Sequence, residues 1–199
     1  MAVKQTKRQE KTQEIRRNIL DQAFRLFTEN GVDTVTVDDI CQACSITKGT
    51  FYHNYESKDH VVSIALNNRL DEYLLENFSL NPEASPADQL SSLLQSAMDF
   101  FRSTGKEMVR KATEALVRSC VDVDGVLEGR VFLRHLEQIV SRILAEKALY
   151  MDSNALELQL QIKALLCGVM VYYAIQDNLL DHLVDWNGII DRQVRSLFR

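Results

Sequence analysis

Turn-forming residues are scarce in this chain, and that scarcity most limits what it can fold into. Only two prolines, Pro82 and Pro86, and seven glycines occur among 199 residues. An all-β sandwich or barrel needs turn signals roughly every 8–12 residues, so this class is excluded. Apolar residues instead recur at three- to four-residue spacing along nearly the whole chain, which predicts an all-α protein.

Capping signals divide the N-terminal third into four helices. Thr12 is a suitable N-cap, and the apolar stripe that follows it ends before Gly31. The sequence Thr36-Val-Asp-Asp39 resembles a capping box and predicts a short helix to about Cys44. A second short helix is expected at 47–54, and a long one from Ser57 to Phe78.

The clearest linker is 81–86, where Ser85 and Pro86 also signal the start of the next helix. The remaining helices are expected at about 86–105, 106–121, 126–149, 153–178 and 184–198, with a turn at 122–125. We therefore expect about nine helices and no strand.

Composition favours a reduced, cytoplasmic protein without a membrane segment. Four cysteines are too few for a disulfide framework, and residues 1–17 are polar and basic rather than signal-like. The longest run without a strongly polar side chain, Ala164–Ile175, has twelve residues, whereas a membrane-spanning helix needs roughly 18. This run is expected to be a buried core helix.

The charge is unevenly distributed. The net charge is −5, but residues 1–17 carry six basic and two acidic side chains, and residues 61–199 carry 14 basic and 19 acidic ones. A basic start on an acidic body suggests that one end of the molecule meets a polyanion.

Residues 36–58 carry the functional signal. Two short helices separated by a tight turn suit a helix-turn-helix, whose second helix enters the major groove by its N-terminal end. Lys48 can donate to guanine, and Thr47 and Thr50 can reach bases or phosphates. Gly49 removes a side chain where the duplex must approach closely.

This window resembles the DNA-binding domain of the tetracycline-repressor-like (TetR) family. The family pattern, roughly T-x-x-x-I-A-x-x-A-G-V-S-x-G-T-x-Y-x-x-F-x-x-K, is matched at six positions at the family's spacing. These are Thr36, Ile40, Gly49, Thr50, Tyr52 and Lys58. Cys41 and Cys44 replace alanines, and Ser45 replaces the turn glycine, which strains the backbone if its φ is positive.

The resemblance implies a DNA-binding domain at 12–60, preceded by a basic flexible tail at 1–11 that lies near the DNA. The domain at 61–199 would bind an effector and form the dimer. The implied base or groove contacts are Thr47, Lys48, Gly49, Thr50 and His53, and the implied phosphate contacts are Thr36, Tyr52 and Lys58. Asp38 stands where some relatives have a basic DNA contact and would repel phosphate.

Other kinds of site find little support in the sequence. Cys41-x-x-Cys44 could suggest zinc, but no second ligand pair completes a site, so core thiols are the better interpretation, with a redox role as the alternative. The chain has no G-x-S-x-G elbow, phosphate loop or H-E-x-x-H pair. We expect neither an enzyme nor a cofactor.

The last two helices are the expected homodimer interface. Ala164–Ile175 is apolar all round, so one face can serve the chain's own core and the other a second subunit; burial of both within one chain is the alternative. The last helix carries a second apolar stripe, from Trp186 to Phe198.

The resemblance also implies a pocket for a small effector in the C-terminal domain. Soft methionine and aromatic walls would suit an apolar or aromatic molecule. The candidate lining residues are Met98, Phe101, Met108, Phe132, Tyr172 and Tyr173. The expected function is a repressor released from a palindromic operator by this effector. The alternative is a DNA-binding protein controlled by a protein partner or without any ligand.

Overall fold

The described part of the chain is all-α, as predicted. The computed structural model describes residues 7–119, 130–149, 153–176 and 183–198. These residues form nine helices and no strand, apart from one isolated antiparallel bridge between Leu149 and Phe198. The helices are α1 (Lys7–Asn30), α2 (Val37–Cys44), α3 (Lys48–Asn54), α4 (Lys58–Asn77), α5 (Pro86–Thr104), α6 (Lys106–Ser119), α8 (Val131–Ala145), α9 (Ala155–Ile175) and α10 (Trp186–Arg195). The turn predicted at 122–125 lies outside the described residues.

The chain forms two compact units, and two of the divisions between them fall inside α4 and α6. Unit 1 comprises Met1–Asn67 and Lys111–Val123, and unit 2 comprises Asn68–Arg110 and Asp124–Arg199. The boundary expected at residue 60 lies near the start of α4, which continues without a break to Asn77. A long helix has no linker-like composition at its middle, so the sequence offers no signal for a division there.

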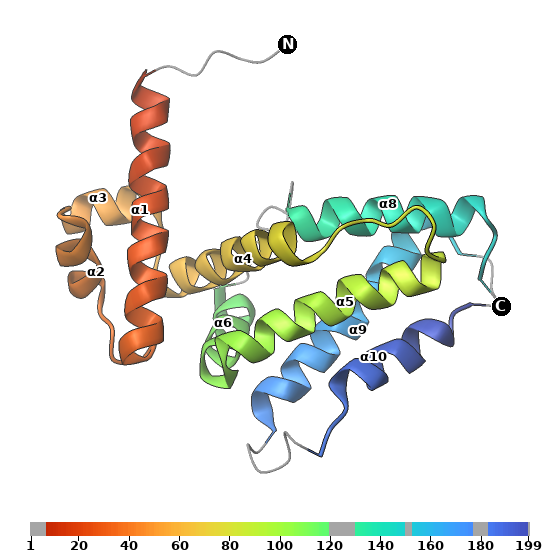
Figure 1. The fold of residues 1–199 in the computed structure, drawn as a ribbon. Coiled ribbons are helices and arrows are strands. Elements are labelled where there is room, and N and C mark those ends of the chain that lie inside the picture. The colour runs from red at the N-terminus through yellow and green to blue at the C-terminus, as the bar shows by residue number, and fades with distance from the viewer. Residues whose placement is uncertain (1–6, 120–129, 150–152, 177–182, 199) are drawn as a thin grey trace. The chain divides into compact units, whose positions relative to one another are not determined.

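Unit 1 is built on α1, which lies beside α2 and α3 (Figure 1). Ile19, Ile40 and Phe51, one from each of these helices, are fully buried. The prediction that α1 begins after Thr12 was wrong, because the helix begins at Lys7. Residues 7–11 are good helix formers that add a polar turn to an amphipathic helix, and the expected flexible tail is therefore shorter.

Caps define several helix starts as predicted. The Thr36 Oγ1 atom accepts from the Asp39 N–H at 3.2 Å, and the Asp39 carboxylate accepts from the Thr36 N–H at 2.8 Å, so the capping box is formed. Ser85 caps α5 with Pro86 in its first turn, and Ser57 Oγ accepts from the His60 N–H at the start of α4. These side chains occupy backbone groups that a helix end leaves unpaired.

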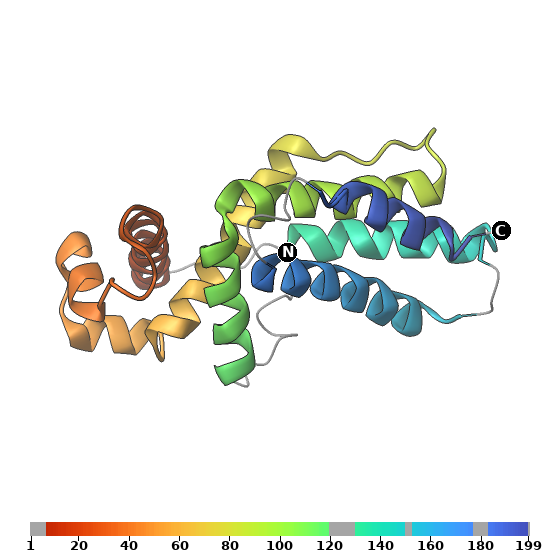
Figure 2. The same ribbon diagram turned by 90° about the horizontal axis from the view of Figure 1, so that it is seen from below.

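Unit 2 is a helical bundle centred on α5. In both views, α5, α8, α9 and α10 run side by side (Figures 1 and 2), and α5 contacts each of the other three. Leu90, Leu94, Leu136 and Ile139 are fully buried in this bundle. Trp186, Ile190 and Val194 are also buried, in a helix that packs mainly on α5. These three α10 side chains are therefore covered by their own chain.

Helix α9 has one buried and one exposed apolar face. Leu158, Ile162, Leu166 and Val169 are buried, as is Tyr173. The opposite face exposes four large apolar side chains: Leu156, Leu160, Tyr172 and Ile175. By length and composition α9 could cross a membrane, although its inner face packs on α5 and α8. The helix is thus only partly the buried core helix that was expected.

Candidate nucleic-acid interface

The turn between α2 and α3 depends on a left-handed residue. Ser45 ends α2 with φ 54° and ψ 44°, and its N–H donates to the Gln42 carbonyl at 3.1 Å. The following Ile46 N–H donates to the Cys41 carbonyl at 3.0 Å. This pattern pairs the last carbonyls of α2 and reverses the chain. Because φ of Ser45 is positive, the backbone carries the strain that was expected where serine replaces the turn glycine.

Helix α3 is capped by a side chain that the sequence assigned to DNA contact. Thr47 Oγ1 accepts from the Thr50 N–H at 3.2 Å and lies 3.1 Å from Thr50 Oγ1. Lys48, Gly49, Tyr52 and His53 are exposed on this helix. Their side chains, together with the bare Cα of Gly49, form the open surface of α3.

The opposite side of α3 is anchored in unit 1. Phe51 is fully buried and Tyr55, just after the helix, is 2% exposed. The Tyr55 hydroxyl donates to the Arg16 carbonyl of α1 at 3.1 Å, and the Arg16 guanidinium lies 5.3 Å from the centre of the Tyr55 ring. Burial is the main cause that raises the pKa of Tyr55. This short helix is therefore positioned by tertiary contacts, since seven residues are too few to be stable alone.

The candidate base contact Lys48 is ion-paired. Its Nζ atom lies 2.9 Å from Asp38 Oδ1 in the first turn of α2, and both side chains are more than half exposed. The hydrogen bond to Asp38 raises the pKa of Lys48 above its ordinary value. The ammonium keeps two further N–H donors, so the pair leaves Lys48 able to contact a base.

Gly49 is not required by the packing of this chain. A Cβ atom at this position would meet only Thr47 Oγ1, at 3.6 Å, which is ordinary van der Waals contact. Glycine in a helix is less stable than alanine by about 1 kcal/mol. The residue is thus costly for folding and has no packing role within the described residues.

Two residues predicted to contact phosphate also have partners within unit 1. Lys58 Nζ donates to the carbonyls of Val32 and Val35, at 2.8 and 2.9 Å, and so holds the segment between α1 and α2. Thr36 Oγ1 donates to the Asp39 carboxylate at 2.6 Å within the capping box. The capping role of Thr36 was predicted from the sequence, whereas the acceptors of Lys58 were not.

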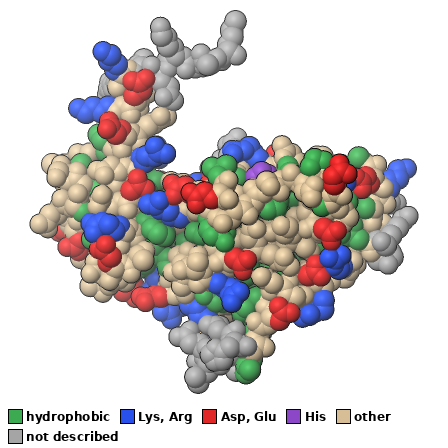
Figure 3. All heavy atoms as spheres, in the orientation of Figure 1, with side chains coloured by type: hydrophobic (Ala, Val, Ile, Leu, Met, Phe, Trp, Pro, Cys, Tyr) green, Lys and Arg blue, Asp and Glu red, His purple; other side chains and the backbone are tan. Residues whose placement is uncertain are grey.

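The N-terminal part of α1 carries charges of both signs, as its side chains show in Figure 3. Lys7 and Lys11 are exposed there, and so are Glu10 and Glu14. Lys4 lies outside the described residues.

The cysteines of the C-x-x-C motif are core thiols. Cys41 and Cys44 are both buried, and Cys44 Sγ lies 3.7 Å from the Asn18 carbonyl. Burial raises the pKa of Cys44 to about 11, so its thiol is protonated at neutral pH. Among the described residues, no group of three or more His, Cys, Asp or Glu side chains could hold a metal ion.

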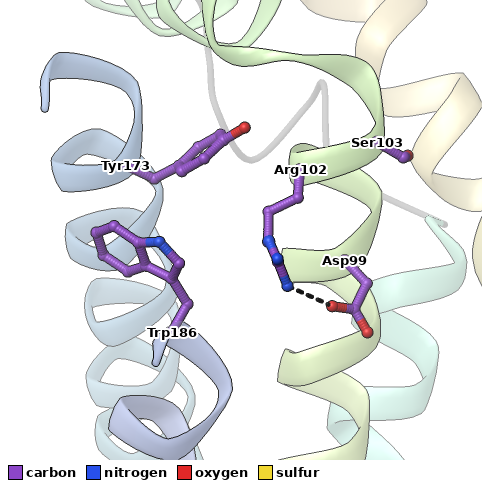
Figure 4. Close-up of a pocket in the computed structure, with 5 residues that line it drawn as sticks. All are labelled: Asp99, Arg102, Ser103, Tyr173 and Trp186. Atoms are coloured by element: carbon purple, nitrogen blue, oxygen red, sulfur yellow. Dashed lines mark ion pairs between the residues drawn. The ribbon is translucent and has the colours of Figure 1, made fainter. Parts of the chain in front are cut away.

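Of the six residues expected to line an effector pocket, five are buried in unit 2 and one is exposed. Met98, Phe101, Met108 and Phe132 are buried, but Tyr172 is 67% exposed. Tyr173, about 100° further round α9, is buried and lines a cavity together with Asp99, Arg102, Ser103 and Trp186 (Figure 4). Asp99, Arg102, Ser103 and Trp186 were not predicted to line a cavity. The single tryptophan of the chain was the one sequence signal that could have drawn attention to this place.

In α3, one side is buried against the rest of unit 1 and the other side is exposed. Helix-turn-helix proteins use such an exposed helix to enter the major groove of DNA. Residues 19–63 match the family model described as bacterial regulatory proteins, tetR family. Over 106 residues the chain is 31% identical to the HTH-type transcriptional regulator AcrR of Shigella flexneri, covering 53% of this chain and 48% of AcrR. It is 26% identical over 180 residues to the transposon Tn10 TetC protein of Escherichia coli, covering 86% and 84%. The part of the chain at 19–63 has the DNA-binding domain of the tetR family of bacterial regulatory proteins, and AcrR, matched over a longer stretch, is named as a transcriptional regulator.

Solved structures extend the likeness of fold to nearly the whole chain. The fatty acid degradation regulator FadR from Bacillus halodurans superposes with a TM-score of 0.64 over 98% of this chain and 97% of that one, at 15% identity. NalD of Pseudomonas aeruginosa, a secondary repressor of a multidrug efflux pump, has a TM-score of 0.52 over 96% and 98%, at 22% identity. At these identities the likeness supports the all-α architecture.

Proposed function

We propose that this protein is a cytoplasmic, sequence-specific transcriptional repressor that binds a palindromic operator through α3. The observation that carries the proposal is the two-sided character of α3. Phe51 and Tyr55 are buried and hold one side of α3 against unit 1, while Lys48 and Gly49 at its N-terminal end are exposed and can enter a DNA groove. An acidic chain can bind DNA in this way because the contact surface is small and local.

The proposed contacts fall into two sets. Lys48 and Thr50 reach base edges near the start of α3, with His53 one turn further along. Tyr52, which is 55% exposed, contacts a phosphate through its hydroxyl. Thr36, Thr47 and Lys58 hold the motif in place through the hydrogen bonds described above.

A second copy of the chain is proposed to cover the exposed face of α9. At 100° per residue, Leu156, Leu160, Ile175 and Tyr172 fall within an arc of about 160°, opposite the buried face of α9. Gly168 lies within this arc, and a Cβ there would meet nothing within 4 Å among the described residues, so a partner helix can approach closely. A twofold dimer presents two recognition helices to half-sites about 34–36 Å apart.

Release by a small molecule is the proposed control. Helix α4 contains residues of both units, so a ligand bound to unit 2 in one conformation can act on unit 1 through a continuous helix. The ligand can shift operator affinity only by its differential affinity for the two states. The alternative is control by a protein partner, and operator affinity unchanged across a broad effector screen would favour it.

A selection from genomic fragments with the purified full-length chain tests the DNA-binding proposal. We expect recovery of a palindromic site whose affinity falls steeply as salt rises, because neutralised phosphates release counterions. Recovery of no common site, with no salt-sensitive binding, would contradict the proposal.

The dimer has a separate test in sedimentation velocity. Gly168→Leu should shift the protein towards monomer, because the added side chain blocks the close approach of α9 to its partner. Ser141→Leu places the same side chain at an exposed position of α8. It is the control and should leave the dimer intact. Equal behaviour of both variants would exclude this face as the interface.

A further inference from the structure

A cavity in unit 2 carries a group without a partner. It has a volume of about 400 Å³ and lies where α5, α9 and the start of α10 meet. Tyr173 and Trp186 lie on one side of it, and Asp99 and Arg102 on the other (Figure 4). This volume lies within the range of small-molecule sites in proteins.

The group without a partner is the indole nitrogen of Trp186. This side chain is 5% exposed, and its Nε1 atom is buried without a hydrogen-bond acceptor among the residues that the structure describes. Its ring meets Tyr173 edge to face, with centroids 5.9 Å apart. A buried N–H left unpaired is destabilising. The cavity therefore favours a ligand that brings a hydrogen-bond acceptor to this wall.

The opposite wall supplies a positive charge. Arg102 Nη1 lies 3.6 Å from Asp99 Oδ1, which is longer than the usual charge-assisted hydrogen bond of about 2.7–2.9 Å. The Arg102 side chain is 52% exposed, so it can turn towards a ligand. Asp99 would keep a partner, because Asn187 Nδ2 donates to the same oxygen at 3.3 Å.

We propose that this cavity binds a small aromatic carboxylate. One carboxylate oxygen accepts from Trp186 Nε1, the other pairs with Arg102, and the aromatic body packs against Tyr173. Two donors on facing walls select an acceptor, and Asp99 in the same wall keeps the hydrogen bond from Asn187 when Arg102 turns towards the carboxylate. The inference deepens the proposed control by a small molecule and rests on it, since it names the site and the ligand class, but its test does not depend on DNA binding.

The fluorescence of Trp186 gives a direct measurement, since it is the only tryptophan in the chain. The full-length protein is titrated with benzoate at constant ionic strength, and benzylamine serves as the cationic comparison. We expect a saturable change in emission with benzoate at a Kd of about 1 mM or tighter, and none with benzylamine. Absence of saturation, or equal binding of benzylamine, would overturn the proposal.

Two variants separate the cavity from binding elsewhere. Arg102→Gln should weaken benzoate binding by about tenfold or more, because it removes the charged partner. Arg110→Gln, at an exposed position of α6, is the matched control and should bind as the parent does. Equal affinities of the two variants would place benzoate outside this cavity and contradict the proposal.

Trp186→Phe tests the indole donor, with binding followed by calorimetry because the variant lacks tryptophan. It keeps an aromatic ring in the core, and we expect weaker benzoate binding; unchanged affinity would contradict the role of Nε1. If this variant does not fold, Arg102→Gln still decides, since its side chain is half exposed. None of these measurements uses DNA, so failure here is distinguishable from failure of the repressor proposal.

Discussion

Lys48 of α3 and Asp38 of α2 form an ion pair of 2.9 Å across the helix-turn-helix. The pair lies where the proposed interface needs positive charge, and it places a carboxylate beside the first basic residue of the recognition helix. Exposed pairs of this kind contribute only about 0–1 kcal/mol to stability. Its main consequence is therefore expected in DNA binding rather than in folding.

Asp38→Asn should strengthen binding to duplex DNA by about 3- to 10-fold at low salt, because a charge that repels phosphate is removed and Lys48 is released. Fluorescence anisotropy at several salt concentrations measures both the affinity and its salt dependence. Glu29→Gln removes an equally paired, exposed carboxylate from α1 and is the control. Weaker binding by Asp38→Asn would mean that the pair is needed to orient Lys48.

Gly49→Ala should separate folding from DNA binding. The chain has room for the methyl group, so the free energy of unfolding should stay the same or rise by up to about 1 kcal/mol. Operator affinity should fall by about tenfold or more, because the methyl group occupies the space that the duplex needs. Thermal unfolding and anisotropy check the two effects. The control, Gln138→Ala at an exposed position of α8, should change neither the free energy of unfolding nor the operator affinity by a comparable amount. Unaltered operator affinity in Gly49→Ala would argue against close approach of DNA at this position.

Ser45→Gly should stabilise the protein, because φ at this position is 54° and glycine adopts that conformation without steric cost. The expected gain in the free energy of unfolding is on the order of 1 kcal/mol. Chemical denaturation measures it. The control, Ser141→Gly inside α8, should be destabilising, since there the residue is helical. A loss of stability in both variants would show that left-handed strain at Ser45 is negligible.

Lys58 and Lys48 should respond differently to removal of their charge. Lys58→Met should lower the free energy of unfolding by about 1–3 kcal/mol, because the carbonyls of Val32 and Val35 lose their donor. Lys48→Met should leave stability nearly unchanged but weaken DNA binding and relax the preference for one base. Denaturation curves and binding to a set of mutated operators compare the two. A stable Lys58→Met variant that binds all operator sequences equally weakly would instead support Lys58 as a phosphate contact.

Local signals explain why so much of the fold was predictable. The Thr36 and Ser85 caps, the break after Cys44 and the helical spacing each depend on residues within a few positions of one another. Partnerships between distant residues were not predictable in this way. Lys58 looked like a surface lysine in a DNA-binding motif, but its acceptors lie 23 and 26 positions earlier in the chain.

The helical class, most helix starts and the helix-turn-helix window could be predicted from the order of the amino acids, because periodicity, caps and motif spacing are local properties. Which faces are covered depends on how the helices pack: Trp186 is buried in its own chain, Tyr172 is exposed, and Arg102 and Trp186 line one cavity. Hydrophobicity states that a side chain favours burial, but only the packing of helices determines which neighbour buries it.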